Sequence, residues 1–295
     1  MLRDRSFQCV LFVIPLALLA YALRPETARR DDPDGIFWNK VSSPAVHDVV
    51  VAGDSRTLQG VSPQAMIQAG AGQKILNFGF NAACLNRRYL TAAAEKLDTG
   101  KKRCVLVIAL TPLGLSRHSE AASNFNWYAK ASGPELVFRK ILTPIEHFVE
   151  PYQFREELKK VSVSHAQRFP DGWLASYVNE ENSTLMHGMY RNILSKSPVA
   201  PELVADLARC IKEFSARGIR VAVFRMPSHW EHQQLEDEVS QWNEAEMKEK
   251  MVSAGAAWLQ FDSRKYKYYD GVHMQASSAS QFSADLAVQL QAAFK

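Results

Sequence analysis

The sequence lacks a strong excess of charge of either sign. Its 295 residues carry 35 Lys and Arg against 31 Asp and Glu, a net charge of +4, with no basic stripe that interleaves aromatic residues. Domains that bind nucleic acid usually carry such a basic face, so no nucleic-acid partner is expected. Internal repeats and long low-complexity segments are also lacking. The remaining composition, 47% hydrophobic and 22% charged, suits one large globular domain.

Cysteine is scarce, with four residues in the chain. Cys9 lies in an apolar run, and the other three are Cys84, Cys104 and Cys210. An odd number without metal-ligand spacing argues against a disulfide framework and favours buried thiols. His229 and His232 are three residues apart, but no third ligand accompanies them. We therefore expect no metal site and no cofactor.

The N-terminus differs from the rest of the chain, with a short basic head before an apolar run from Phe7 to Leu23. Residues 1–24 fit either a membrane anchor or a cleaved signal peptide. The anchor is favoured because the run continues to Leu23 without a polar region before cleavage. Residues 25–45 are polar and predict a linker. We expect the remainder, residues 46–295, to lie outside the cytoplasm, either anchored by the single helix or secreted after cleavage.

Runs with strand character follow the linker, and helical patterns lie between most of them. The predicted strands are His47–Gly53, Lys74–Gly79, Arg103–Leu110, Ile219–Met226 and Ala256–Asp262. The predicted helices are Pro63–Ala69, Asn86–Leu97, Pro201–Arg217, Leu235–Ala254 and Ala279–Ala293. Several strands are apolar throughout, as in strands buried on both faces. Strand–helix alternation predicts an α/β fold with a mostly parallel five-stranded sheet between helices.

Residues 116–200 interrupt this alternation between the third and fourth strands, and they are too many for a simple crossover. The part "ELVFRKILTPIEHFVEPYQFREELKK" has helical periodicity, and aromatic-rich loops flank it. We expect a helical insertion at the rim of the sheet. It either packs on the sheet or forms a lid, a membrane-facing surface or a partner dock.

The first predicted strand ends abruptly in Gly53, Asp54 and Ser55, just before a helical pattern. A serine at a strand-to-helix corner has two interpretations. It caps the helix by accepting from free N–H groups, or it is a nucleophile mounted at the carboxyl edge of the sheet, where ligands bind in such folds.

Asp270 and His273 are three residues apart in "KYYDGVHMQ", just before the last predicted helix. A turn can place the carboxylate on one imidazole nitrogen and leave the other free as a base. Gly79, at the end of the second strand, can bring a backbone N–H close to an oxyanion. An Asp-x-x-His pair by itself also fits a surface turn, but these residues and Ser55 would all lie on the same rim of the sheet.

The order of these three blocks resembles the SGNH (GDSL-like) hydrolase family over residues 46–295, apart from the insertion. The resemblance implies a flavodoxin-like three-layer sandwich with Ser55, Asp270 and His273 as the catalytic residues. It also implies an oxyanion site made by the N–H groups of Ser55 and Gly79. The family's third block usually supplies an asparagine, but "IALTPLGLS" has none. Thr111 is the nearest polar residue there, and Asn81 of the second block is the other substitute.

Three further residues are candidate substrate contacts. Arg56 stands where the family usually has leucine; it either binds an anionic or sugar group or pairs with an acid. Arg225 and Ser228, with His229, follow the fourth strand on the same rim and either line the cleft or form a polar loop.

The N-terminal run and the altered third block are similar to a membrane-anchored subset of the family that acts in bacterial cell-envelope chemistry. That similarity implies acyl transfer or ester hydrolysis on an exported glycan or a small acyl ester, beside a membrane-bound O-acyltransferase. Water and a glycan hydroxyl both remain open as acceptors. The rival interpretation is an accessory or binding protein that keeps the fold without useful turnover.

Overall fold

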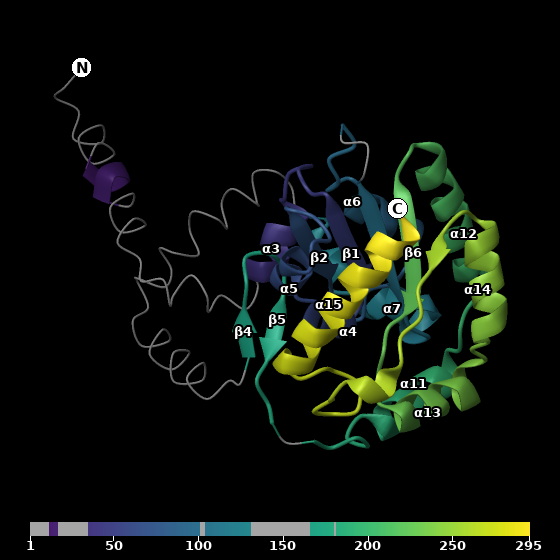
Figure 1. Ribbon diagram of the computed structural model, residues 1–295. Coiled ribbons are helices and arrows are strands. Elements are labelled where there is room, and N and C mark those ends of the chain that lie inside the picture. Colours follow the sequence, from purple (N-terminus) through teal and green to yellow (C-terminus); the bar gives the residue numbers. More distant parts are fainter. Residues whose placement is uncertain (1–11, 17–34, 101–103, 131–165, 180) are drawn as a thin grey trace. The chain divides into compact units, whose positions relative to one another are not determined.

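The computed structural model describes residues 12–16, 35–100, 104–130, 166–179 and 181–295 (Figure 1). The chain divides into two units, and the fold below is that of residues 36–129 and 166–295. Residues 12–16 of the other unit are helical. Within the described ranges, no helix has the length and apolar character needed to cross a membrane. The predicted anchor or signal peptide otherwise lies outside these ranges, so it stays a prediction.

A parallel sheet of five strands forms the centre of the domain (Figure 1). Its strands are β1 (Val49–Gly53), β2 (Ile75–Gly79), β3 (Val105–Leu110), β6 (Arg220–Arg225) and β7 (Ala257–Trp258). They lie in the order β2-β1-β3-β6-β7, and every neighbouring pair is parallel. All residues of β1, β2 and β3 are buried, which explains the unbroken apolar runs of β1 and β3 and the single polar residue, Asn77, in β2. The predicted parallel α/β sheet is confirmed.

Helices cover both faces of the sheet. They include α4 (Ser55–Gly60), α5 (Pro63–Gln68), α6 (Arg87–Ala94), α12 (Pro201–Ala216), α13 (Trp230–Ser240), α14 (Glu244–Ser253) and α15 (Ala276–Ala293). Helix α15 packs on α4 and α5 over one face, whereas α6 and α12 pack together over the other. Because the strands are parallel, the β1–α4 turn lies at their carboxyl rim.

The single helix predicted for Leu235–Ala254 is wrong: α13 ends at Ser240, and α14 starts at Glu244. Gln241 adopts a left-handed backbone with φ of 60°, which stops α13. Asn243 then caps α14 by accepting from the Glu246 amide. Residues with good helix propensity on both sides hide this break in the sequence.

The described parts of the insertion are only partly helical. They hold α7 (Arg117–Ala122), α8 (Phe125–Tyr128), α11 (His187–Lys196) and an antiparallel hairpin of β4 (Ala166–Arg168) and β5 (Leu174–Ser176). Phe125, Tyr128 and Trp173 are buried, so these aromatic residues pack in the core, whereas Trp127 and Tyr177 are about half exposed. Residues 131–165, with the whole of the predicted amphipathic stretch, lie outside the described residues.

Trp173→Ala is expected to lower the free energy of unfolding by about 3–5 kcal/mol, the range for truncating a buried aromatic side chain. The Trp173 ring stacks on Phe169 at 4.9 Å, and its Nε1 donates to the Gln59 carbonyl of α4 at 2.8 Å. Trp127→Ala is the matched control, because Trp127 is 50% exposed against 6% for Trp173. Urea unfolding measures both. Equal losses for the two variants would contradict a core role for Trp173.

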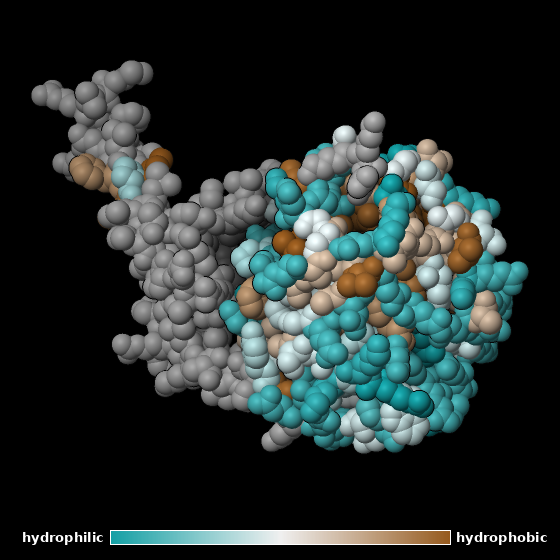
Figure 2. All heavy atoms as spheres, in the orientation of Figure 1, coloured by the Kyte–Doolittle hydropathy of each residue, from teal (hydrophilic) through white to brown (hydrophobic). Residues whose placement is uncertain are grey.

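Hydrophilic residues make up most of the molecular face in Figure 2, with apolar residues between them. Val288 of α15, 60% exposed, is one exposed apolar residue of the domain. Single exposed apolar side chains are normal on protein surfaces, and they need no functional explanation.

Candidate active site

Ser55 is the first residue of α4, directly after β1 and Asp54. The capping role falls to Asp54, whose Oδ1 accepts from the Arg56 amide at 3.0 Å. Thr111 holds the other oxygen of this carboxylate, because its hydroxyl donates to Asp54 Oδ2 at 2.7 Å. Asp54, and not Ser55, therefore caps α4, and the Ser55 hydroxyl forms a different hydrogen bond.

That hydroxyl meets His273. Ser55 Oγ lies 2.9 Å from His273 Nε2, and His273 Nδ1 lies 2.7 Å from Asp270 Oδ2. An ionised carboxylate can only accept, so Nδ1 carries the proton and Nε2 of the neutral ring accepts from the serine. The structure thus joins Ser55 and His273, which are 218 positions apart, in the hydrogen-bonded order of a serine triad.

A tight turn holds Asp270 in place. Its Oδ1 accepts from the amides of Val272 at 2.9 Å and His273 at 2.7 Å, and Gly271 takes a φ of 86° within the turn. Burial by itself would raise the pKa of Asp270, but hydrogen bonds from the His273 ring and these amides outweigh it and lower that pKa. Asp270 is therefore ionised when it faces the imidazole.

Tyr269 is a residue of this site that the sequence reasoning missed. Its ring stacks on His273 with centroids 5.9 Å apart and planes at 19°, and its hydroxyl donates to Gln59 Oε1 at 2.7 Å. The stacked ring limits the rotation of the imidazole. The "KYYDG" context was the available signal, but a tyrosine next to Asp270 does not reveal which side its ring takes.

The oxyanion prediction needs correction for Gly79 and Thr111. The Gly79 amide donates to Asn77 Oδ1 at 2.8 Å, so this N–H already has an acceptor within the protein and does not serve an oxyanion. Gly79 is needed for close packing instead, since a Cβ there would lie 2.4 Å from the Leu58 amide of α4. The Thr111 hydroxyl donates to Asp54 and accepts from the Gly114 amide at 3.0 Å, which makes Thr111 a support of the β1–α4 corner.

The other two predicted oxyanion donors, the Ser55 amide and Asn81, remain candidates. The Ser55 amide is in the first turn of α4, where helix N–H groups have no intrahelical acceptor. Asn81 is exposed in the turn after β2, beside Ala82, whose φ of 48° is unusual for a residue with a side chain. An anion at Ser55 would thus meet the N-terminal end of α4.

Arg56 does not face a cleft, so its prediction as a substrate contact is wrong. The side chain is 1% exposed and forms a bidentate ion pair with Glu236 of α13. Its guanidinium also lies over the Tyr190 ring, 5.2 Å from the centroid. The alternative interpretation of a paired charge is confirmed. Burial by itself would raise the pKa of Glu236, but the Arg56 guanidinium outweighs it and holds that pKa well below its usual range.

Ser228 is buried, and Arg225 is partly buried with its side chain in ion pairs, which corrects their prediction as substrate contacts. Arg225, 8% exposed, pairs with Glu236 at 3.4 Å and with Asp237 at 2.8 Å. Ser228 is fully buried, and its Oγ has no hydrogen-bond partner in the described part of the chain. The ion pairs of Arg225 belong to the same buried group as those of Arg56.

The described cysteines fit structural roles. Cys84, Cys104 and Cys210 are free and buried, as predicted. Among the described residues, no three His, Cys, Asp or Glu side chains are grouped to hold a metal ion.

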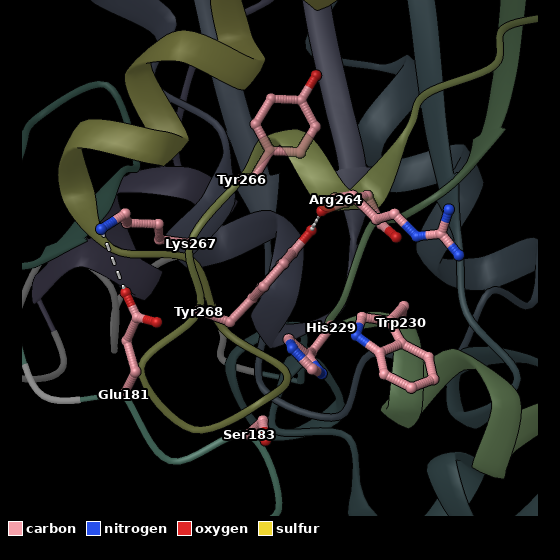
Figure 3. Close-up of a pocket in the computed structure, with 9 residues that line it drawn as sticks. Glu181, Ser183, His229, Trp230, Arg264, Tyr266, Lys267 and Tyr268 are labelled. Carbon is pink, nitrogen blue, oxygen red and sulfur yellow. Dashed lines mark hydrogen bonds and ion pairs between the residues drawn. The ribbon is translucent and has the colours of Figure 1, made fainter.

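A cavity of about 560 Å³ lies beside the turn that carries Asp270 and His273 (Figure 3). Its lining residues come from three segments: Glu181, Ser183, His229, Trp230, Ser263, Arg264, Tyr266, Lys267 and Tyr268. His229 and Trp230 of the segment after the fourth predicted strand both line it. The remaining lining residues were not predicted from the sequence: Lys267 and Tyr268 stand just before Asp270, but they follow no pattern that indicates a cavity.

A scan against protein-family models found no match for this chain. Searches of the curated proteins and of the solved structures found no match either. The geometry of Ser55, His273 and Asp270 is therefore the main indication of function.

Proposed function

We propose that this protein is a serine-dependent esterase or acyltransferase of the SGNH type. The observation that carries the proposal is the hydrogen-bonded chain from Ser55 through His273 to Asp270, with contacts of 2.9 Å and 2.7 Å. Each contact is within the range for a nucleophile, its base and the group that orients the base. The strand order is that of the flavodoxin-like sandwich, which supports the family resemblance.

In the proposed reaction, Ser55 Oγ attacks the ester carbonyl while His273 Nε2 takes its proton. The carbonyl oxygen becomes an oxyanion at the N-terminal end of α4. His273 then returns the proton to the leaving alcohol as the C–O bond breaks, which leaves an acyl-Ser55 ester. Water or a glycan hydroxyl attacks this ester, again with His273 as base, and releases the acid or the new ester. Asp270 orients the imidazole throughout.

The wider setting is part of the same proposal. The acyl groups are O-acetyl or related groups on a cell-envelope or exported glycan, and a membrane-bound O-acyltransferase is the proposed partner. Residues 1–24 anchor the protein and leave the domain outside the cytoplasm. The family resemblance and the apolar N-terminal run support these points.

A second candidate is an accessory protein of the same fold without useful turnover. The observation that favours it is the engagement of the Gly79 amide by Asn77, which removes one expected oxyanion donor. Loss of one such donor costs about 3 kcal/mol of transition-state stabilisation.

A fluorophosphonate probe distinguishes the two candidates. We expect covalent labelling of the wild type and none of Ser55→Ala, because only a serine activated by a base attacks phosphorus readily. Ser280→Ala on α15 is the control, since the Ser280 hydroxyl bonds to the Ala276 carbonyl and should leave labelling unchanged. Intact-mass spectrometry measures the adduct. A folded wild type that stays unlabelled would favour the accessory protein.

A further inference from the structure

The cavity adjoins the turn that carries Asp270 and His273. The His229 amide donates to the Gly271 carbonyl at 2.9 Å, and a Cβ on Gly271 would lie 2.0 Å from the Ser183 carbonyl. Both His229 and Ser183 line the cavity. Tyr268, another lining residue, bridges to Met274 on the far side of the turn. The turn that carries Asp270 and His273 therefore borders the cavity, and its contacts are made at Gly271, two residues before His273.

One side of the cavity is aromatic (Figure 3). Trp230 is 46% exposed, its ring centroid lies 5.8 Å from that of His229, and the Tyr268 ring meets His229 at 6.3 Å. The Tyr268 ring is buried and meets His229 edge-on, so the half-exposed Trp230 indole is the flat apolar face that solvent reaches. The C–H faces of a sugar ring pack well on such a surface. The polar atoms at the edges of Trp and Tyr rings can also form hydrogen bonds with the ligand.

The other side is polar. Figure 3 shows Lys267 directed toward Glu181, with Nζ and Oε1 3.5 Å apart, and the Tyr268 hydroxyl donates to the Ser263 carbonyl at 3.0 Å. A volume of about 560 Å³ is within the range of small-ligand sites. An exposed indole with hydrogen-bonding groups around it suits a hydroxyl-rich ring better than a purely apolar ligand.

The charge of the lining favours an acid. Lys267 is offset by Glu181, whereas Arg264 makes no ion pair with any described residue. A guanidinium presents two parallel N–H groups that match a carboxylate. Arg264 thus provides the charge that distinguishes a uronic acid from a neutral sugar.

We propose that this cavity binds an acidic sugar unit of the glycan on which Ser55 acts. The inference rests on the proposed function for its link to acyl transfer, but binding itself needs no turnover. Trp230 supplies the stacking surface, and Arg264 pairs with the sugar carboxylate.

The test is isothermal titration of Ser55→Ala with hexagalacturonate and with cellohexaose at low salt, so that binding is measured without reaction. We expect hexagalacturonate to bind at least about tenfold more tightly, and Trp230→Ala to weaken it by about tenfold or more. Arg264→Ala should remove the preference for the acidic oligosaccharide. The matched controls are Trp127→Ala, 50% exposed on α8, and Arg88→Ala, exposed on α6. Neither should change the affinity.

Three results would overturn the proposal: equal affinity for both oligosaccharides, no binding of either, or unchanged affinity in Arg264→Ala. Arg264 is exposed, so its variant tests the idea even where Trp230→Ala folds poorly. The fluorophosphonate result separates the two proposals. Labelling without oligosaccharide binding would overturn the cavity proposal alone, and binding without labelling would overturn the acyl-transfer chemistry alone.

Discussion

Ser55→Ala and His273→Ala are expected to lower kcat for ester hydrolysis by about 10⁶-fold, whereas Asp270→Asn is expected to lower it by about 10⁴-fold. In the proposed mechanism, Ser55 and His273 take part in bond making and proton transfer, so removal of either one ends the covalent route. Asp270 acts there on the orientation and tautomer of His273, so some reaction should survive its loss.

The geometry of the turn explains why Asp270→Asn is still severe. Asp270 Oδ1 accepts from two backbone amides, so an asparagine keeps its carbonyl oxygen there to preserve the turn. Its NH₂ group then faces His273 Nδ1, which must become the acceptor. The ring proton moves to Nε2, where it points at Ser55 Oγ, and the base is lost.

Steady-state hydrolysis of p-nitrophenyl acetate measures these losses as kcat and kcat/KM. Asp206→Asn on α12 is the control, because Asp206 pairs with Arg209 at the surface. Wild-type rates in Ser55→Ala and His273→Ala would contradict the mechanism. A loss in Asp270→Asn as large as that in Ser55→Ala would contradict the orienting role alone.

The sequence predicts the sheet and the meeting of Ser55, His273 and Asp270 well, for related physical reasons. Strands buried on both faces are mostly apolar, so β1 and β3 stand out as continuous apolar runs. Parallel strands bring their carboxyl ends to one rim, which explains why Ser55 and the Asp270–His273 turn meet. By contrast, β7 pairs over only two residues, fewer than its apolar pattern predicts.

The roles of individual polar groups are harder to predict. Arg56 pairs with Glu236, 180 positions away, and nothing near Arg56 in the sequence indicates that partner. Asn77 takes the Gly79 amide only two residues on, but this depends on a side-chain rotamer rather than on residue type. Both cases concern which of several available partners a group selects, and that choice is made by packing.

The buried ion pairs next to Ser55 lead to the second large effect. Glu236→Ala is expected to lower the free energy of unfolding by about 3–5 kcal/mol, because removing one partner leaves a buried charge without compensation. Glu236 is fully buried between Arg56 and Arg225, and His232 Nε2 lies 3.7 Å from its Oε1. Arg225 keeps Asp237 and Glu244, whereas Glu236 supplies the ion pair of Arg56.

Urea unfolding of Glu236→Ala, with Glu238→Ala as control, measures this loss. Glu238 is on the same helix two residues later but is exposed, so its variant should change stability by no more than about 0.5 kcal/mol. The double variant Arg56→Met with Glu236→Leu should recover much of the loss, since apolar residues of similar volume can replace a buried pair. Equal stability of Glu236→Ala and Glu238→Ala would show that the pair contributes nothing. A double variant as unstable as the sum of its single variants would show that the two side chains act independently.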